Sequence, residues 1–398
     1  MWTLRIENQM SVRVYLDWNA SAPLRPEAHA AACAALALSG NPSSVHGEGR
    51  AARRLIEQAR EDVAALVGAE ARNVIFTSGG TEANALALSP MLERGADKQP
   101  FARLLISAIE HPSVRAGGRF APGAVTEVPV RSEGVVDLDV LERSLASGSR
   151  ALVSLMAANN ETGVVQPIAA AAEIVHRFGG LLHVDAVQAA GRMPLDINAL
   201  GADLLTLSAH KIGGAKGAGA LIKRAEALHF GDPLIKGGGQ ERGARAGTEN
   251  VAAIAAFGAA AAAARNRLGD EIAHMAALRE RLEAGLRALT PEAVIFGADV
   301  ERLPNTTLVT LPGAKAETLV IGFDLEDIAV SSGAACSSGK VAPSHVLAAM
   351  GIPRELARGA IRASTGAATT TADIDQFLEV WKKLVQRLSI KEKRGLAA

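Results

Sequence analysis

Short apolar runs alternate with helical patterns along the first half of the chain, and this alternation constrains the fold more than any other feature. The runs are Val74–Phe76, Leu104–Ile106, Ala151–Leu155, Leu181–Val184 and Leu204–Leu207. Buried strands interleaved with helices predict an α/β fold with a largely parallel sheet covered on both faces. Ligands of such sheets bind at the carboxyl ends of the strands, so the residues just after each run are the candidates for function.

Composition and charge exclude several classes of protein. The 398 residues are 48% hydrophobic and 21% charged, which is typical of a globular protein with room for two domains. Lys and Arg together number 42, as do Asp and Glu, so no direct binding to nucleic acid is indicated. No apolar run approaches the length of a membrane span, and Glu7 interrupts the start where a signal peptide would be basic and then apolar. We therefore expect a cytoplasmic protein with no membrane partner.

The two cysteines, Cys33 and Cys336, lie far apart and form no Cys-x-x-Cys, so neither a disulfide framework nor a metal site is expected. Alanine-rich surroundings predict that Cys33 is a small buried apolar residue. Cys336 lies within Ser331–Lys340, a run of small residues that predicts a mobile loop. An accessible thiol there can reach a substrate when deprotonated, although composition alone equally fits an inert residue.

Several helices are expected outside the alternating region. One runs from about Gly49 to Val67, and its arginines are interspersed with acids, which favours a solvated, salt-bridged face. These arginines are Arg50, Arg53, Arg54 and Arg60. Helical patterns over Val251–Arg265 and Glu271–Leu289 precede a strand over Asn305–Leu311. The closing helix carries an apolar stripe from Ile374 to Leu388, which is expected to be core.

The stretch Thr77–Asn84 follows the first run and turns directly into a helix. Its glycines, its hydroxyls and the start of a helix together predict an anion cradle, because free backbone N–H groups and the helix dipole point at the ligand. It lacks the Gly-Lys-Ser/Thr of a nucleotide P-loop and the spacing of a dinucleotide fingerprint. A plain capped turn is the alternative interpretation.

Polar residues also follow the other runs. His111 follows one run directly before a proline, and Asn159–Gly163 follows the next. Asp185 ends an apolar strand, where a carboxylate is costly unless it is paired with a cation. Lys211, in Ser208–Lys211, is followed by glycines, and a lysine in a protected pocket can form a Schiff base with an aldehyde. Taken singly, His111 is better explained as a turn residue, and Lys211 is better explained as a solvated loop lysine.

Together these strand ends combine a lysine, an anion cradle and a carboxylate, which is the set that pyridoxal phosphate requires. In this combination the chain resembles the cysteine desulfurases of the nitrogen-fixation and iron-sulfur assembly type, first group, within the class V aminotransferase-like, fold type I enzymes. The resemblance runs from about Tyr15 to Asp375. Its motifs are Asn41–Ser44, Thr77–Asn84, Glu110–His111, Asn159–Gly163, Val184–Gln188, Ser208–Lys211, Gly237–Arg242 and Gly247–Asn250.

The resemblance implies a role for each of these residues. Lys211 would carry the cofactor, Asp185 would pair with the pyridine nitrogen, and Gln188 would contact the ring hydroxyl. His111 would stack on the ring as a catalytic residue beside Lys211. The phosphate would be held by Gly80, Thr81, Ser208 and His210, joined by Thr248 from the other subunit of a homodimer.

The resemblance also implies the architecture. A large domain, residues 23–262, would hold the cofactor on a mainly parallel seven-stranded sheet between helices. A smaller α/β domain, residues 1–22 and 263–398, would carry the mobile cysteine loop. One departure is Trp18–Ser21, where the family more often has Asn-Asn-Ala-Thr. By the resemblance, no catalytic role rests on that stretch.

The implied reaction converts L-cysteine to L-alanine, with the sulfur held as a persulfide on the nucleophile Cys336. Asn160 would lie beside the ring and the substrate, and Arg362 would hold the substrate carboxylate, with Arg358 as its nearby rival. The sulfur would pass to iron-sulfur scaffolds or to other thiolation acceptors. A selenocysteine lyase, another class V aminotransferase-like enzyme and a catalytically silent sulfur-carrier scaffold remain the alternatives.

Overall fold

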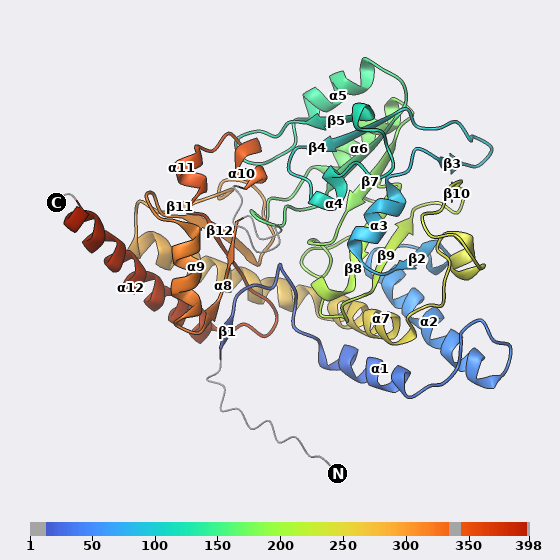
Figure 1. Ribbon diagram of the computed structural model, residues 1–398, viewed down its shortest axis with the longest axis horizontal. Helices are drawn as coiled ribbons and strands as arrows, with labels where there is room; N and C mark the ends of the chain where they lie inside the picture. Colours follow the sequence, from blue (N-terminus) through green and yellow to red (C-terminus); the bar gives the residue numbers. More distant parts are fainter. Residues whose placement is uncertain (1–12, 334–343, 396–398) are drawn as a thin grey trace, which may run out of the picture.

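The computed structural model describes residues 13–333 and 344–395, and a seven-stranded sheet forms its largest layer (Figure 1). The strands, in spatial order, are β2 (Val74–Thr77), β9 (Gly219–Lys223), β8 (Leu204–Ser208), β7 (Leu181–Asp185), β6 (Ala151–Met156), β4 (Arg103–Ser107) and β5 (Val125–Val128). β9 is antiparallel to β2 and β8, and the other neighbours are parallel. The predicted mainly parallel seven-stranded sheet is confirmed.

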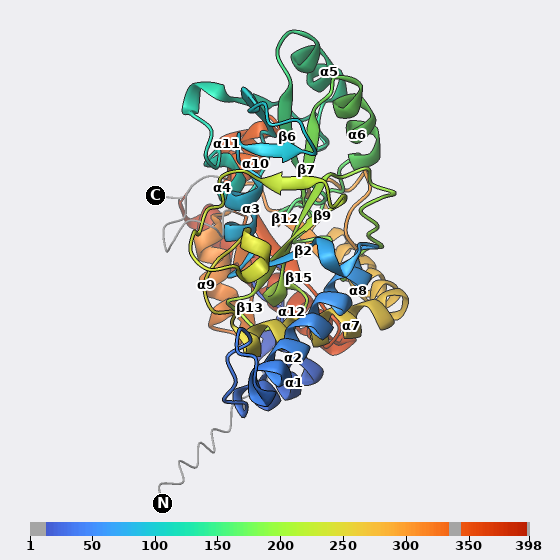
Figure 2. The same ribbon diagram turned by 90° about the vertical axis from the view of Figure 1, so that its right-hand side faces the viewer.

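Helices cover both faces of this sheet because successive side chains of a strand point to opposite sides. On one face, Phe76 of β2 belongs to an apolar cluster with Ile56 of α2 and Phe257 of α7. On the other face, Ile75 clusters with Leu86 of α3. The helices of this part are α1 (Pro26–Leu36), α2 (Gly47–Leu66), α3 (Gly80–Ala87), α4 (Pro112–Arg115), α5 (Leu138–Ala146), α6 (Ile168–Arg177) and α7 (Val251–Asn266). Figure 2 shows α1, α2 and α7 packed side by side.

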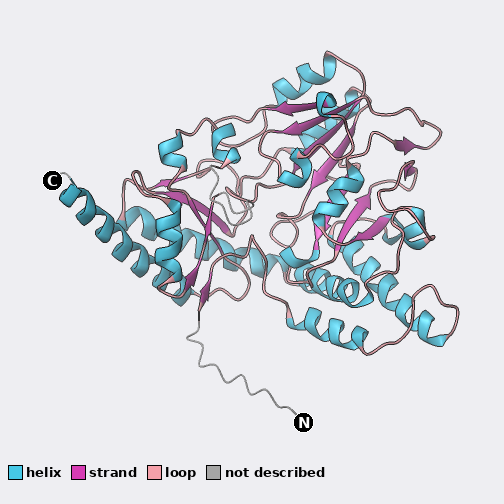
Figure 3. Cartoon of the chain, in the orientation of Figure 1, coloured by secondary structure: helices cyan, strands magenta, loops and turns pink. Residues whose placement is uncertain are grey.

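A second, smaller sheet contains four antiparallel strands in the order β11 (Val294–Ile295), β12 (Thr306–Thr310), β15 (Ile361–Ser364) and β14 (Ser331–Ser332). Its helices are α8 (Leu268–Leu289), α9 (Ala316–Asp324), α10 (His345–Ala349), α11 (Arg354–Ala357) and α12 (Thr371–Gly395) (Figure 3). Phe377 and Trp381 of α12 are fully buried, so the predicted apolar stripe is core. In the described part of the chain, no helix is both long and apolar enough to cross a membrane.

Two short pairings complete the strands. β3 (Leu92–Arg94) pairs antiparallel with β10 (Leu228–Phe230). β1 (Val14–Tyr15) pairs parallel with β13 (Ile328–Ala329), and Asp17 continues alongside Ser364 of the smaller sheet. The residues that follow β1 thus start from the small sheet and lead to the carboxyl edge of the large one, where the candidate site lies.

Two expectations about single residues are wrong. Cys33 is exposed rather than buried, with its Sγ 3.6 Å from His29 Nε2, because that side of α1 faces away from the core. Arg60 is 2% exposed rather than solvated. Its guanidinium forms two bonds to Glu241, at 2.7 and 2.8 Å, so a partner 181 positions along the chain makes its burial tolerable.

Candidate active site

The polar residues at the strand ends line a common cavity of about 210 Å³. It lies at the carboxyl ends of β6, β7 and β8, as a largely parallel sheet predicts. Its lining includes the predicted site residues Gly80, Thr81, His111, Asn160, Asp185, Gln188, Ser208, His210 and Lys211. Segments distant in sequence therefore supply one site.

Lys211 follows β8 at the end of a single 3₁₀ turn, Ala209–Lys211, and its amine points to the segment after β1. Nζ donates to the carbonyl oxygen of Asn19 at 2.5 Å and to that of Ala20 at 2.9 Å. His210 lies beside it, with Nδ1 3.3 Å from Ser21 Oγ. Burial, aided by the positive charges of Lys211, Lys216 and Arg192, lowers the pKa of His210 to about 4. His210 is therefore neutral at pH 7.

Asp185 ends β7 with its carboxylate fixed by two donors. Oδ2 accepts from Asn84 Nδ2 at 2.8 Å, and Oδ1 accepts from the backbone N–H of Val187 at 3.0 Å. Asn84 belongs to α3, so this bond connects the end of β7 to the helix of the predicted cradle. The sequence pattern assigns no role to Asn84, although Asn84 closes the Thr77–Asn84 motif.

His111 caps α4 through its own side chain. Nδ1 accepts from the backbone N–H of Ser113 at 3.2 Å and lies 2.8 Å from Ser113 Oγ. Burial and the charge of Lys211 lower the pKa of His111, and Asp185 opposes them. A neutral ring that accepts at Nδ1 carries its proton on Nε2. The capping contact thus fixes both the orientation and the tautomer of the ring.

Glu110 lies behind His111 and is completely buried. Its Oε1 accepts from Ser107 Oγ at 2.9 Å and from the backbone N–H of Met156 at 2.7 Å. Its Oε2 has no hydrogen-bond partner among the described residues. Burial, reinforced by the negative charge of Asp185, raises the pKa of Glu110 to about 8. Glu110 is therefore mainly protonated at pH 7. As a neutral acid it accepts hydrogen bonds from both β4 and β6.

The predicted cradle lies where β2 turns into α3. The first backbone N–H groups of α3 face a cavity that Gly80, Thr81 and Ser208 line, together with Lys216. Gly219 of β9 lets the turn approach closely, because a Cβ at Gly219 would lie 2.5 Å from the carbonyl carbon of Gly79. This helix start, with hydroxyls and a lysine around it, suits a phosphate group.

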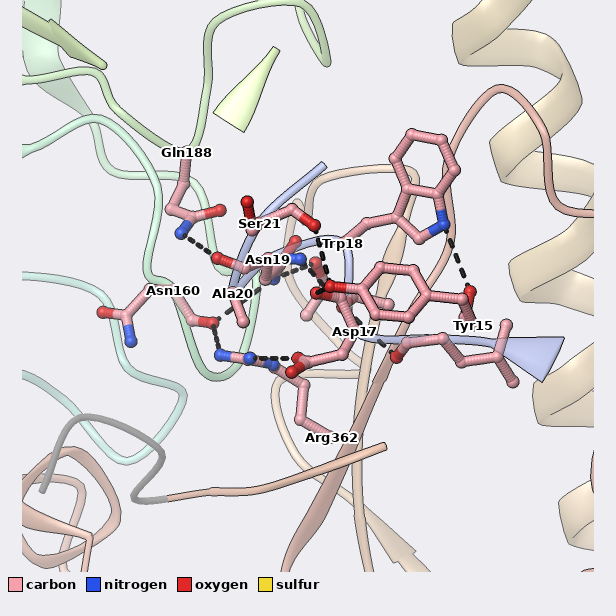
Figure 4. Close-up of polar contacts among 12 residues, drawn as sticks. Tyr15, Asp17, Trp18, Asn19, Ala20, Ser21, Asn160, Gln188 and Arg362 are labelled. Atoms are coloured by element: carbon pink, nitrogen blue, oxygen red, sulfur yellow. Dashed lines mark hydrogen bonds and ion pairs between the residues drawn. The ribbon is translucent and has the colours of Figure 1, made fainter. Parts of the chain in front are cut away.

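The segment from Tyr15 to Ser21 crosses the site (Figure 4), and it includes Trp18–Ser21, the stretch to which the resemblance gave no catalytic role. The carbonyl oxygen of Asn19 accepts from Gln188 Nε2 at 3.1 Å as well as from Lys211. The Asn19 Nδ2 group donates to the carbonyl oxygen of Asn160 at 3.3 Å. Backbone carbonyl groups accept the hydrogen bonds from Lys211, so these contacts could not be predicted from the side chains of the segment.

Two of the described candidates lie outside the cavity that Lys211 lines. Arg362, on β15, is 2% exposed, and it donates to the carbonyl oxygen of Asn160 at 2.8 Å and to Asp17 Oδ1 at 2.7 Å (Figure 4). Its Nε has no hydrogen-bond partner in the described chain. Its rival Arg358 is exposed. Thr248 lines a separate cavity of about 160 Å³. Cys336 lies outside the described residues.

Comparisons with known proteins agree with this geometry. Residues 14–377 match the family model of class-V aminotransferases. A cysteine desulfurase from Cereibacter sphaeroides is 45% identical over 382 residues, which cover 94% of this chain and 96% of that protein. The chain belongs to the cysteine desulfurases of this family. Another member, cysteine desulfurase IscS of Dictyoglomus turgidum, is 39% identical and covers 95% of this chain, with 96% of its own length matched.

Solved structures of similar proteins support the family assignment. A NifS-like protein from Rickettsia africae has a TM-score of 0.86 at 39% identity, covering 94% of this chain and 99% of that one. A protein named SspA, solved in complex with cysteine, has a TM-score of 0.73 at 28% identity, covering 88% of this chain and 98% of that one. The fold of cysteine desulfurases therefore extends over nearly the whole chain.

Cysteine desulfurases of class V depend on pyridoxal phosphate, and the donor set of the cavity fits that cofactor. The cofactor has an aldehyde, a phosphate and a ring nitrogen, and the cavity offers Lys211, the start of α3 and Asp185 for them. Asp185 is 6% exposed, and Asn84 and the Val187 N–H, which donate to it, are neutral, so a protonated ring nitrogen would supply the positive charge that a buried carboxylate needs.

Proposed function

We propose that this protein converts L-cysteine to L-alanine with the aid of pyridoxal phosphate and holds the sulfur as a persulfide on Cys336. The observation that carries the proposal is the single cavity in which Lys211, Asp185 and the cradle at Gly80 meet. The relatives described above are named as cysteine desulfurases, and the similar SspA was solved with cysteine. Both support cysteine as the substrate.

Different residues of the cavity would bind the cofactor, move the proton from Cα and orient the ring. Pyridoxal phosphate, when bound, supplies an aldehyde for the substrate amine and a ring that spreads the negative charge developing at Cα. Lys211 would bind the cofactor and, once released by the substrate amine, take the proton from Cα. Asp185, fixed by Asn84, would hold the proton on the ring nitrogen. The neutral His111 would lie against the ring without adding a competing positive charge.

Arg362 is the proposed anchor of the substrate carboxylate. Its guanidinium is fixed by Asn160 and Asp17, and the unpartnered Nε, within the described chain, leaves a donor for a ligand. A planar guanidinium matches a carboxylate through two parallel hydrogen bonds. The exposed side chain of Arg358 lacks these fixed contacts, which favours Arg362 over its rival.

Cys336 is the proposed nucleophile. Its thiolate would attack the sulfur of bound cysteine, so that an S–S bond forms, the Cβ–S bond breaks, and its electron pair remains with the carbon that becomes the methyl group of alanine. The described residues on either side of the stretch that contains Cys336 each form a hydrogen bond. The Gly333 N–H donates to Ala360 O at 3.0 Å, and Ser344 Oγ donates to Glu161 Oε2 at 2.6 Å.

A homodimer, a sulfur acceptor and a cytoplasmic location complete the proposal. Thr248 lines a cavity other than that of Lys211, which is compatible with a role in the partner subunit. The persulfide would pass to iron-sulfur scaffolds or to other thiolation acceptors, whose identity can be tested by transfer from Cys336. A solution mass of twice the chain mass would support the dimer.

The test is to measure alanine and sulfide from L-cysteine with the purified, cofactor-loaded protein. We expect Cys336→Ala to retain the visible absorbance of the cofactor and to lose alanine formation, whereas Cys33→Ala, which removes the exposed cysteine of α1, serves as the control. Lys211→Ala should lose both the absorbance and turnover. Keto-acid formation without sulfide would instead indicate an aminotransferase, and normal cysteine turnover by Cys336→Ala would contradict the assigned nucleophile.

A further inference from the structure

Asn19 is a buried residue through which the segment after β1 contacts both sheets. It is 1% exposed, and its backbone N–H donates to Ser364 Oγ of β15 at 3.0 Å. Its Nδ2 donates to Thr306 Oγ1 of β12 at 2.9 Å, and its Oδ1 accepts from Asn305 Nδ2 at 3.0 Å. The amide group of Asn19 is therefore fixed by the strand β12 and the residue before it.

The carbonyl group of the same residue faces the cavity. Asn19 O and Ala20 O lie 2.5 and 2.9 Å from Lys211 Nζ, and Asn19 O also accepts from Gln188 Nε2 at 3.1 Å. Successive carbonyl oxygens at hydrogen-bond distance define where an ammonium or amine group rests. The small sheet thus fixes, through Asn19, a carbonyl oxygen that accepts from the amine of Lys211.

We infer that Asn19 is a positioning residue, whose side chain holds the carbonyl oxygens of Asn19 and Ala20 as the resting site of the Lys211 amine. This role deepens the proposed function. Only the measurement of cysteine turnover rests on that function, and the measurement of cofactor binding does not. Lys211 must be placed within reach of the cofactor's aldehyde when the cofactor is loaded, and of the substrate's Cα during turnover. A fixed resting site serves both, because small displacements of a reacting group are costly in rate.

Asp17 lies two residues earlier in the same segment and provides a comparison. Its carboxylate pairs with Arg362 at 2.7 Å (Figure 4), whereas the contacts to the Lys211 amine come from Asn19 O and Ala20 O. Loss of the Asp17 carboxylate should therefore disturb the substrate anchor and leave the lysine in place. Comparing variants of Asp17 and Asn19 therefore separates a displacement of Lys211 from a general disturbance of the segment after β1.

The decisive measurement is the rate at which apoprotein recombines with pyridoxal phosphate, followed by visible absorbance at a temperature where every variant is folded. We expect Asn19→Ala to lower this rate constant about fivefold or more and to lower kcat about 10- to 100-fold, with a smaller change in KM for cysteine. Asp17→Asn should leave the recombination rate unchanged and raise KM.

Two further variants keep the inference testable. Thr306→Val removes a side-chain partner of Asn19 at nearly constant volume, and it should also lower the recombination rate. It therefore provides the test if Asn19→Ala does not fold. Thr310→Val, on the same strand, removes a partly buried hydrogen bond to Leu356 O instead and should destabilise the protein without changing the recombination rate. Recombination at the wild-type rate in both Asn19→Ala and Thr306→Val would overturn the inference, even in a protein that proved not to act on cysteine.

Discussion

Glu110, His111 and His210 are ionisable side chains around Lys211 whose burial favours their neutral forms. The pKa of Glu110 is raised to about 8, that of His210 is lowered to about 4, and that of His111 is also lowered. A protonated acid and two neutral imidazoles leave few competing charges beside the lysine. The charges of the cofactor and the substrate then meet few competing charges from these three side chains.

The raised pKa of Glu110 predicts how stability depends on pH. Its pKa is about 8 in the folded protein against 4.5 in the reference state, so the folded chain binds a proton that the unfolded chain loses between these values. Its stabilising contribution is present at low pH and is lost as pH rises towards 8. We expect wild type to lose about 1 to 3 kcal/mol relative to Glu110→Gln between pH 5 and pH 8 in urea unfolding.

The control for this pH series is Glu355→Gln, which changes an exposed acid. Its unfolding free energy should follow that of wild type at every pH. Parallel curves for wild type and Glu110→Gln would show that Glu110 carries no proton across this range.

Arg362 predicts a separation between substrate binding and cofactor binding. Arg362→Lys keeps the charge and loses the planar fork, so KM for cysteine should rise about 10- to 100-fold while the visible absorbance of the cofactor stays. Arg358→Lys, the same change at an exposed position, should leave KM as in wild type. A larger rise of KM in Arg358→Lys than in Arg362→Lys would show that Arg358 is the anchor of the substrate carboxylate.

At the scale of elements, β9 is the unusual strand of the large sheet. It lies antiparallel between β2 and β8, the strands that lead to the cradle and to Lys211. Gly219, its first residue, pairs with both Thr77 and Ser208. The spacing between the cradle and the lysine therefore depends on one strand without catalytic residues of its own.

Gly219→Ala should weaken cofactor binding, because its Cβ would meet the backbone of Gly79 at 2.5 to 2.9 Å and displace the cradle. We expect the dissociation constant of pyridoxal phosphate to rise about tenfold, which corresponds to about 1.4 kcal/mol. Titration of apoprotein with the cofactor measures it. Gly123→Ala, where an added Cβ meets nothing within 4 Å, is the matched control. Equal affinities in the two variants would show that the cradle tolerates the displacement.

The sequence predicted these elements well where the pattern is local. Each apolar run became a strand, and the residues after the runs line one cavity, because parallel strands bring their carboxyl ends together. Contacts between distant residues could not be predicted this way. Arg60 looked solvated because its partner Glu241 is far along the chain, and Asn19 carried no signal because its backbone makes the contact to Lys211.

At the scale of the whole molecule, the buried pair of Arg60 and Glu241 joins α2 to β2 and to the segment that precedes Thr248. Besides Arg60, Glu241 Oε2 accepts from the backbone N–H of Phe76 at 2.9 Å. Arg60 also donates to Val74 O at 2.9 Å. Both side chains are 2% exposed, so neither charge can turn to water if its partner is lost.

Glu241→Gln should therefore lower the free energy of unfolding by about 3 to 5 kcal/mol, because the buried Arg60 charge then keeps only its single ion pair with the partly exposed Glu57. The exposed pair of Arg281 and Asp375 gives the comparison, and Asp375→Asn should lower the free energy of unfolding far less, because water solvates both exposed charges. Denaturant unfolding of both variants measures the difference. Similar losses in the two would mean that water reaches the buried pair.

The central place of β9 also has a consequence for the order in which the protein can assemble during its synthesis. β2 is made early, yet among the described strands it pairs with β9 alone, so within the described chain its backbone groups have no strand to pair with until residue 223 has left the ribosome. β1 waits longer still, because its partner β13 begins at Ile328. A growing chain therefore exposes its first apolar strands for much of its synthesis, and chaperones that shield such strands should be needed most before residue 223 has emerged, while β1 and β2 both lack their partner strands.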